Sequence, residues 1–258
     1  MRILAIDTST SWCSVALSFD DQPVIHRHEH VGSKASQVLL PWCNTLLKQI
    51  GAGFADLDAI AVGVGPGAFT GVRLSVAVAQ GLAVGTNLPV IPVTSLDAMA
   101  TQLIQSHNNQ MDDQRFIIAL DARMGEVYWA PYQILNGKPQ AIHEIRLCSP
   151  EAIETNDANY IAGNAITEYP EIFSKIPIKT IDPELVPHAL GTLTCAKPIY
   201  EAGRAISVNQ LEPLYIRNKV ALTTQERHDA ANGAPTGDRK STRLNSSHEW
   251  ISRMPSSA

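Results

Sequence analysis

The chain has 258 residues, of which 45% are hydrophobic and 17% are charged, and it contains 16 Gly and 16 Pro. These proportions are typical of a globular protein, and they exclude a disordered, collagen-like or coiled-coil chain. With 20 Lys and Arg against 25 Asp and Glu, the formal charge is -5, which opposes direct binding to the phosphate backbone of a nucleic acid.

The cysteine pattern and the first residues predict a cytoplasmic protein. Cys13, Cys43, Cys148 and Cys195 show no CxxC spacing, so we expect neither a zinc ribbon nor a disulfide framework. The first apolar run meets Asp7 too soon for the core of a signal peptide. No run approaches the ~20 apolar residues of a membrane span, so we expect no contact with a membrane.

The first segments in chain order predict an antiparallel meander. Residues 3–6 form a short apolar run, and residues 14–19 alternate apolar and small polar side chains. The turn DDQP then leads into residues 24–28. Short runs of this kind, separated by turn residues, are typical of neighbouring β-strands.

Two helices, each with one apolar face, follow the meander. In residues 33–50 apolar side chains recur at three- and four-residue steps, and Pro41 is expected to kink this helix or to begin its main part. A buried strand at 57–64 precedes a second helix at 70–84, whose small side chains form a smooth stripe. The two stripes consist of Leu39, Trp42, Leu46 and Ile50 in the first helix and Val72, Ser75, Val76, Ala79 and Ala83 in the second.

The second half of the chain begins as the first half does. The composition changes at residues 108–114, after which a strand at 116–120 ends in Asp121, as the strand at 3–6 ends in Asp7. Each strand continues through a small-residue turn into an alternating strand. Although chance can produce two such pieces, the repeat indicates two related subdomains. The other expected elements are strands at 90–93, 126–133, 160–163 and 211–220, and helices at 95–105 and from 190 to about 198.

The end of the chain lacks any apolar period. In residues 237–258, six of 22 residues are Ser and the charge turns positive. We interpret residues 223–258 as a disordered tail that resembles a cloning or reading-frame scar, and a functional tail is the alternative. The expected domains are therefore residues 1–107, a smaller subdomain at 108–222, and this tail.

Two segments are candidates for a phosphate site. Asp7, Thr8 and Thr10 follow a predicted strand, where an acid can hold a Mg²⁺-bound water and hydroxyls can touch phosphate. Gly65 and Gly67 lie in the loop GPGAFTGVR, where glycines allow the backbone to approach a ligand closely. The loop lacks the GK[ST] ending of a Walker A motif. Ordinary turn and capping roles explain the same residues equally well.

Several segments taken together resemble the TsaB (YeaZ) family. Residues 1–136 contain the opening MRILAIDTSTSWCSVALS, then AIAVGVGPGAFTGVRLSVAVAQGLA, LPVIPVTSLDAMA and IIALDARMGEVYWAPYQ. The later segment LEPLYIRNKVA looks like the C-terminal strand of that family, whereas residues 137–210 carry little of the resemblance. The resemblance implies an α/β fold of the actin-like, Hsp70-like (ASKHA) type, with two related subdomains whose mixed sheets are flanked by helices.

The resemblance also implies a role in forming N6-threonylcarbamoyladenosine at position 37 of tRNAs that read ANN codons. In that pathway a synthase makes threonylcarbamoyl-AMP, and a TsaD-type transferase passes on the threonylcarbamoyl group. The TsaB family is the partner that the transfer requires, without being its catalyst. The implied partners are the transferase and, through the complex, a TsaE-type ATPase, with tRNA contacted only indirectly. Whether the chain alone forms a homodimer stays open.

Two absences agree with a subunit that has no catalytic residue. TsaD-like chains carry an HxxxH pair on one helix face, where both His reach one metal, and here Ser95 and Met99 occupy those positions. Actin-like folds make room for adenosine with a Gly-Gly pair, and the segment YIAGN at 160–164 supplies one glycine. We therefore expect no metal, no cofactor and no ATP binding by the chain alone. An actin-like phosphotransferase or ATPase is the first alternative, and a metallopeptidase is the second.

Two further clusters have both a functional and a structural interpretation. His26, His28 and His30 alternate, so they share one face of a predicted strand, as a metal site or a pH-sensitive patch would require. An exposed polar face is the commoner explanation. Asp121 with Arg123 and Glu126 is either an active-site cluster or, as is more common, a group that holds the hairpin turn and a local ion pair.

An interaction function places the partner on the predicted helices at 33–50 and 70–84, where two helices from each protein would make a four-helix contact. Packing of the same stripes against the chain's own sheet is the alternative. The expected contact residues are Leu39, Trp42, Leu46, Val72, Ser75, Val76, Ala79 and Ala83.

Overall fold

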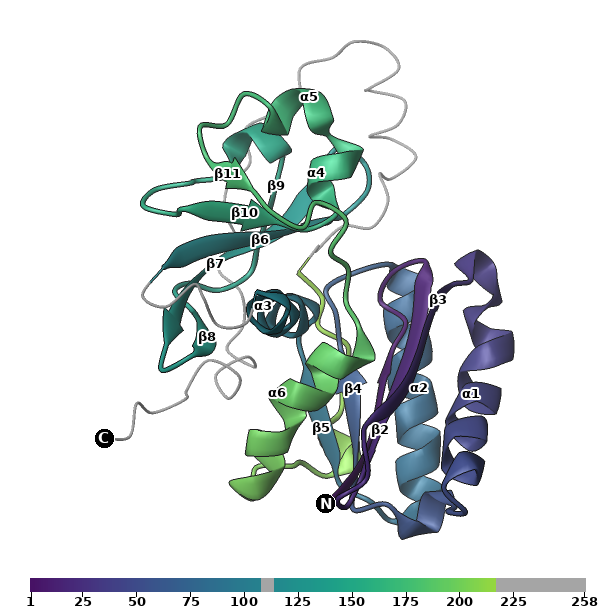
Figure 1. Ribbon diagram of the computed structural model, residues 1–258. Coiled ribbons are helices and arrows are strands. Elements are labelled where there is room, and N and C mark those ends of the chain that lie inside the picture. The colour runs from purple at the N-terminus through teal and green to yellow at the C-terminus, as the bar shows by residue number, and fades with distance from the viewer. Residues whose placement is uncertain (108–113, 217–258) are drawn as a thin grey trace. The chain divides into compact units, whose positions relative to one another are not determined.

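The computed structural model describes residues 1–107 and 114–216, which contain two mixed β-sheets. The first sheet has the strand order β3-β2-β1-β4-β5 (Figure 1). Its first three strands are antiparallel neighbours, and β4 and β5 run parallel to β1. The predicted meander and buried strands are thereby confirmed as β1 (Arg2–Asp7), β2 (Trp12–Phe19), β3 (Ile25–His30), β4 (Ala59–Gly63) and β5 (Val90–Val93).

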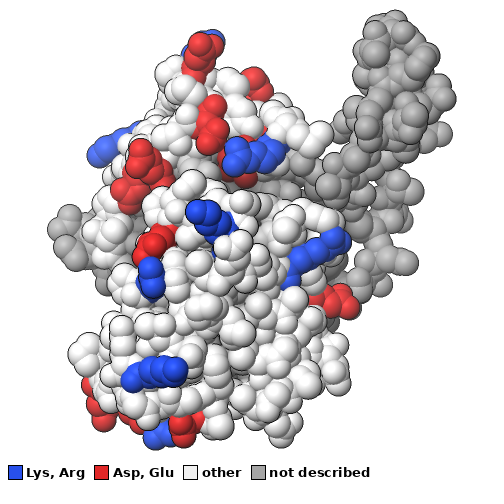
Figure 2. Space-filling model, turned by 90° about the vertical axis from the view of Figure 1, so that its right-hand side faces the viewer, with Lys and Arg blue, Asp and Glu red and all other residues white. Residues whose placement is uncertain are grey.

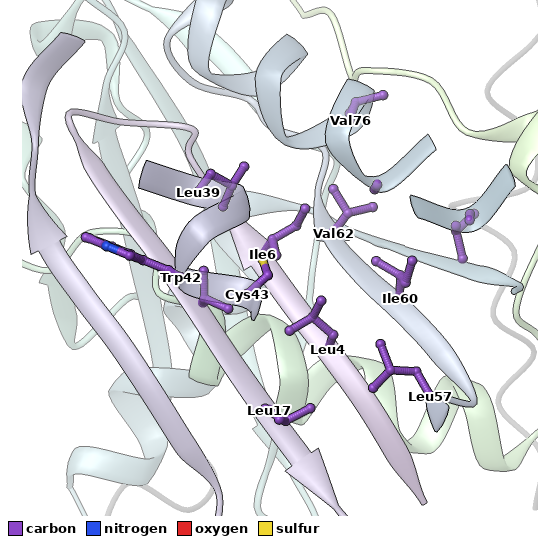
Figure 3. Packing of buried hydrophobic residues seen from close by; sticks show 14 of the residues in the cluster. Leu4, Ile6, Leu17, Leu39, Trp42, Cys43, Leu57, Ile60, Val62 and Val76 are labelled. Atoms are coloured by element: carbon purple, nitrogen blue, oxygen red, sulfur yellow. The ribbon is translucent and has the colours of Figure 1, made fainter. Parts of the chain in front are cut away.

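Because side chains alternate along a strand, β1 contributes residues to two cores, one on each face of the first sheet. Leu4 and Ile6 pack in the core covered by α1 and α2, whereas Ile3 and Ala5 pack in the core covered by α6. In Figure 3, Leu39 and Trp42 of α1 lie over the strands of the first core. The helices are α1 (Ala35–Gln49), which contains Pro41, α2 (Phe69–Thr86) and α6 (Ala189–Glu201).

The second sheet repeats the arrangement of the first. Its order is β8-β7-β6-β10-β11, with β9 outside this path. When β9 is left out of the count, the strands of both sheets follow the order third, second, first, fourth, fifth along the chain. The first three are again antiparallel and the last two parallel, and β9 also pairs with β7. This shared topology confirms the actin-like fold of two related subdomains. The elements are β6 (Arg115–Asp121), β7 (Val127–Leu135), β8 (Lys138–Ala141), β9 (Arg146–Cys148), β10 (Tyr160–Ala162), β11 (Lys179–Thr180), α4 (Ala165–Glu168) and α5 (Pro170–Phe173).

Two helices pack on the sheet that does not precede them in the chain. Helix α3 (Ser95–Ser106) follows the first sheet but joins the core of the second, and α6 follows the second sheet but covers the first. The two helices meet where an added Cβ on Gly191 would overlap the carbonyl oxygen of Ala98. The division between residues 107 and 108 stays a prediction. The strands of the two sheets lie on either side of it, while α3 and α6 each pack on the sheet from the other side of it.

Several elements differ from the sequence predictions. Helix α6 continues through Pro198 to Glu201. Residues 211–216 form no strand, although the amide of Leu214 donates to the carbonyl oxygen of Val64 at 2.8 Å. Residues 217–220 of that predicted strand, residues 108–113 and the predicted tail lie outside the described residues. Among the helices that are described, none is both long and apolar enough to cross a membrane.

Candidate functional site

The polar groups of the turn after β1 form hydrogen bonds with one another. The Oδ1 atom of Asp7 accepts hydrogen bonds from the amide of Ser9 at 2.8 Å and from its hydroxyl at 2.6 Å. The Asp7 carboxyl is 2% exposed, and its Oδ2 atom has no hydrogen-bond partner within the described part of the chain. Burial raises the pKa of this carboxyl, while the two bonds from Ser9 lower it.

The start of α2 closes this turn from the other side. The hydroxyl of Thr8 donates to the carbonyl oxygen of Gly71 at 2.6 Å, and the amide of Ala68 donates to the carbonyl oxygen of Ser9 at 2.6 Å. An added Cβ on Gly71 would overlap the carbonyl oxygen of Thr8, and one on Gly67 would overlap that of Ser9. These two glycines therefore permit contact between two segments of the same chain.

The five residues predicted on the phosphate side make contacts within the chain itself. Thr10 accepts a hydrogen bond from the amide of Trp12 at 3.2 Å, which stabilises the turn. Gly65 has a φ of +97° and lies beside Val72, and its carbonyl oxygen accepts a hydrogen bond from the amide of Ser95 at 2.8 Å. The hydroxyls of Thr8 and Thr10 are thus engaged within the chain, as the turn interpretation of these residues expects.

The two positions at which TsaD-like chains carry the HxxxH pair lie inside this protein. Ser95 and Met99 are both fully buried, and Met99 belongs to the apolar core of the second sheet. Between them, Asp97 accepts a hydrogen bond from the hydroxyl of Tyr132 at 2.8 Å. Burial raises the pKa of Asp97 and holds that of Tyr132 well above its ordinary value. This face of α3 therefore contributes to the packing of the second sheet.

The corresponding turn of the second sheet is an ion-paired hairpin. Asp121 accepts from the amide of Arg123 at 2.9 Å and from the hydroxyl of Tyr169 at 3.0 Å, and it lies 3.3 Å from the Nε of Arg123. Nearby, an added Cβ on Gly163 would overlap the carbonyl oxygen of Ala119. The one glycine on the expected adenosine side is thus needed where two strands of the sheet approach.

The three alternating histidines share one face of β3, on which His28 packs against His188 at the start of α6 while His26 and His30 are exposed. His28 stacks on Trp12 at a ring-centroid distance of 4.5 Å and on His188 at 4.1 Å. His188 caps α6, because its Nδ1 atom accepts a hydrogen bond from the amide of Leu190 at 2.9 Å. In the described parts of the chain no group of three potential ligands is arranged to hold a metal ion. The imidazoles form an aromatic stack instead.

The residues predicted to contact a partner lie in the chain's own core. Each of the eight side chains is at most 5% exposed, and the hydroxyl of Ser75 donates to the carbonyl oxygen of Gly63 at 2.9 Å. These side chains are therefore not available to a partner. Packing against the sheet, the alternative, explains both stripes, because the most apolar face of each helix covers the strands. The residues in question are Leu39, Trp42, Leu46, Val72, Ser75, Val76, Ala79 and Ala83.

Helix α2 turns a different set of side chains outward, which the sequence reasoning missed. Ala77, Gly81, Val84 and Gly85 are exposed, and Val84 is 70% exposed. An added Cβ on Gly81 or Gly85 would meet nothing within 4 Å, so packing gives no reason for either glycine. Glycine inside a helix costs roughly 0.5–1 kcal/mol relative to alanine. Two glycines within a helical pattern were the signal in the sequence that pointed to this face.

Comparison with known proteins identifies the family. The family model for TsaD, described as tRNA N6-adenosine threonylcarbamoyltransferase, matches residues 28–221. The Escherichia coli K12 protein named tRNA threonylcarbamoyladenosine biosynthesis protein TsaB is 37% identical over 235 residues, covering 86% of this chain and 96% of that protein. The chain belongs to the TsaB family.

Further TsaB relatives agree in sequence and in fold. The protein of the same name from Haemophilus influenzae is 36% identical and covers 85% of this chain and 95% of its own length. The solved structure of YeaZ from Pseudomonas aeruginosa has a TM-score of 0.73 at 34% identity, over 83% of this chain and 100% of that one. The TsaB resemblance noted in the sequence therefore extends over both sheets.

Proposed function

We propose that this TsaB-family chain is a non-catalytic subunit that binds and activates a TsaD-type transferase. The product would be N6-threonylcarbamoyladenosine at position 37 of tRNAs that read ANN codons. The names of the relatives support the pathway, since they describe proteins of tRNA threonylcarbamoyladenosine biosynthesis. The TsaD family model supports the choice of partner, because it matches this chain over residues 28–221.

The outward face of α2 is the observation that carries the proposal. Two helical glycines there, Gly81 and Gly85, have no packing reason within the described residues, and Ala77 beside them is also small and exposed. Small side chains let a helix of another protein approach closely, and the contact then offsets the helix propensity that glycine sacrifices. The exposed face of α2 therefore replaces the buried stripe as the proposed contact surface.

The closed turn after β1 favours this proposal over an actin-like phosphotransferase. A phosphate would need amides and hydroxyls that point into open space. Here the hydroxyl of Thr8 is bonded to Gly71, and both the amide and the hydroxyl of Ser9 are bonded to Asp7. The buried Ser95 and Met99 likewise offer nothing to the metal of a peptidase.

Reconstitution tests the proposed function. The TsaD-type transferase, a TsaE-type ATPase, threonylcarbamoyl-AMP and tRNA are combined with and without this chain, and modified adenosine is measured by mass spectrometry. We expect modification only when the chain and the transferase are both present. ATP hydrolysis or tRNA modification by the isolated chain would refute a non-catalytic role.

A surface variant tests the proposed contact face. Ala77→Arg places a long charged side chain on the outward face of α2 without filling the core, because Ala77 is exposed. We expect it to weaken binding to the transferase more than tenfold, since a desolvated charge without a partner opposes association. Gln140→Arg, an exposed position on β8, is the matched control and should bind as the unmodified chain does. Equal binding by both variants would exclude this face.

A further inference from the structure

Strand β3 is the longest edge strand in the described part of the chain. It has six residues and no proline, and among the described strands it pairs with β2 alone (Figure 1). The other strands at the ends of the two sheets are less suited to pairing, because β5 contains Pro92, β8 contains Pro139 and β11 has two residues. An edge strand presents a row of backbone groups to which a further strand can bond. Of these edges, β3 is the one that offers a regular ladder.

The hydrogen bonds to β2 determine which backbone groups of β3 face outward. Just after β3, the amide of Val31 donates to the carbonyl oxygen of Ser11 at 3.0 Å, in the register that β2 and β3 share. In an antiparallel ladder, every second residue exchanges hydrogen bonds with the neighbouring strand. The odd-numbered residues of β3 therefore bond to β2. The even-numbered residues, from 26 to 30, direct their amides and carbonyl oxygens away from the sheet.

Two copies of β3 would pair best in a single register. Because only even-numbered residues face outward, a two-fold axis between antiparallel copies passes through a residue and not between two residues. An axis at His28 brings the most outward-facing residues into the ladder and gives about six backbone hydrogen bonds. It also places Arg27 of one copy opposite Glu29 of the other, with Cα atoms ~4.5 Å apart, whereas an axis at Arg27 or at Glu29 sets like charges opposite each other.

Arg27 and Glu29 make β3 complementary to itself in this register. The two side chains are 44% and 50% exposed, and the Nε of Arg27 lies 2.7 Å from the Oε1 of Glu29. The Cζ of Arg27 also lies 4.2 Å from the ring centroid of Trp42, so the side chain is restricted before any contact forms. In the paired register each arginine has one glutamate beside it on its own strand and a second across the axis, so the four charges alternate in sign.

Helices α1 and α2 have a different charge pattern. Neither helix contains Asp or Glu, and their charged residues are Lys48 and Arg73. Figure 2 shows this side of the molecule, where much of the surface is uncharged and single Lys and Arg side chains stand apart. α2 packs on β4, and β2 and β1 separate β4 from β3. Pairing through β3 therefore leaves the outward face of α2 accessible, and a charge change on β3 leaves the charges of both helices unaltered.

We propose that β3 is a docking edge for β3 of a second copy of this chain, paired antiparallel about His28, so that two five-stranded sheets join into one. The contact is small because each copy buries one strand edge, and we expect a dissociation constant of about 10–100 µM. The exposed charges of Arg27 and Glu29 set the register and add little affinity. Such pairing is independent of the proposed function, since it leaves the outward face of α2 unoccupied.

Charge exchange on the full-length chain tests the pairing. Arg27→Glu gives β3 two glutamates and Glu29→Arg gives it two arginines, so each variant alone sets like charges opposite each other. An equimolar mixture of the two variants sets unlike charges opposite each other again. In sedimentation equilibrium we expect this association to weaken about tenfold or more in each variant and to recover in the mixture. Thermal melting of each variant verifies that the fold is retained.

Arg146→Glu and Glu154→Arg are the matched controls for the charge exchange. Arg146 also stacks on a tryptophan and pairs with an exposed glutamate, Glu154, at 2.9 Å, but Glu154 lies outside any strand. Both control variants should associate as the unmodified chain does.

A cysteine pair locates the contact. The Cα atoms of residues 27 and 29 would face each other across the axis at a distance that suits a disulfide. A mixture of Arg27→Cys and Glu29→Cys with oxidised glutathione should therefore give a covalent dimer on a non-reducing gel. Arg27→Cys alone should give little, because residue 27 does not oppose itself in this register. The unmodified chain, which has its own four cysteines, gives the background.

Recovery of association in the charge-exchanged mixture, together with the mixed cysteine cross-link, would support pairing through β3. Equal association by the unmodified chain, both charge variants and their mixture would mean that copies meet through another surface, and the proposal would be wrong. No association of the unmodified chain at ten times the expected dissociation constant would also overturn it. Arg27 and Glu29 would then keep the edge unpaired, as charges on edge strands commonly do. None of these results bears on the proposed function, which the reconstitution tests separately.

Discussion

The two turns that follow the first strand of each sheet have the same place in the topology but different surroundings. Asp7 ends β1 and is buried, and its turn is covered by the glycine-rich start of α2. Asp121 ends β6, and its turn continues into the exposed Arg123 and Met124. The same strand-and-acid unit thus gives a closed turn in one sheet and an open hairpin in the other.

The difference shows that the covering element decides the role of a strand-end acid. At Asp7, two backbone segments approach so closely that Gly67 and Gly71 cannot carry a Cβ without overlap. At Asp121, the partners are the amide and the guanidinium group of Arg123 and the hydroxyl of Tyr169. An Asp at the end of a strand is therefore no indication of catalysis until its neighbours are known.

The largest expected effect comes from filling the closed turn. Gly71→Ala places a Cβ against the carbonyl oxygen of Thr8, and we expect a loss of about 3 kcal/mol in the free energy of unfolding. Gly125→Ala in the open turn meets no atom within 4 Å but has a φ of +73°, so it should cost only about 1 kcal/mol. Urea denaturation of both variants measures the contrast. Equal losses would mean that the two turns are packed alike.

Acid should loosen the first sheet before the second. Burial lowers the pKa of His28 to about 4 and that of His188 to about 3, from the ordinary value of 6.5. Their neutral rings stabilise the fold fully above pH 6.5, and this contribution is lost as the pH falls from 6.5 toward 4 and 3. Discounted for the solvent that reaches both rings, we expect about 1–2 kcal/mol of loss at pH 5.

Hydrogen exchange at pH 7 and pH 5, corrected for the intrinsic rates, locates this loss. Protection in β2 and β3 should fall relative to β6 and β7. His188→Asn keeps a capping side chain on α6 without the titrating ring, so it should reduce the effect of acid. A uniform response of both sheets would contradict the assignment to these two histidines.

The smallest expected effect is on stability, when each of the two strand-end acids, Asp7 and Asp121, is replaced by Asn. Asp7→Asn removes a buried charge that has one unpartnered oxygen, and because burial raises the pKa of this carboxyl, the charged form opposes folding at neutral pH. We expect about 1 kcal/mol of added stability at pH 7, with the benefit shrinking as the pH falls toward that raised pKa. Asp121→Asn should change stability by less than about 0.5 kcal/mol, since its ion-pair partner Arg123 is exposed. Thermal melts at several pH values test both.

Local patterns predicted most of the first sheet. Apolar runs and alternation located β1, β2 and β5, because each of these strands buries at least one face. The short strands β8 and β11 were not predicted, since they lie at sheet edges and are mostly exposed. Helix α6 was predicted to end near Pro198, but that proline lies in the last turn, where a missing amide removes only one bond.

The candidate site was predicted less well than the fold. The spacing of Val72, Val76 and Ala79 identifies the apolar face of α2 correctly but does not say whether a sheet or a partner covers it. Only the burial of these side chains in the structure shows that the sheet, and not a partner, covers this face. In the same way, no local pattern reveals that Tyr215 reaches Arg73, because the two residues are 142 positions apart.

The exchange of helices between the sheets has a consequence for synthesis of the protein. Residues 189–201 cover one face of the first sheet, where they pack against Ile3, Ala5 and Ala16. When the ribosome has completed the strands of that sheet, this face still lacks its cover, and it stays so until nearly two hundred residues have emerged. The first sheet therefore depends on α6 to become stable, and we expect termination before residue 189 to leave an aggregation-prone fragment.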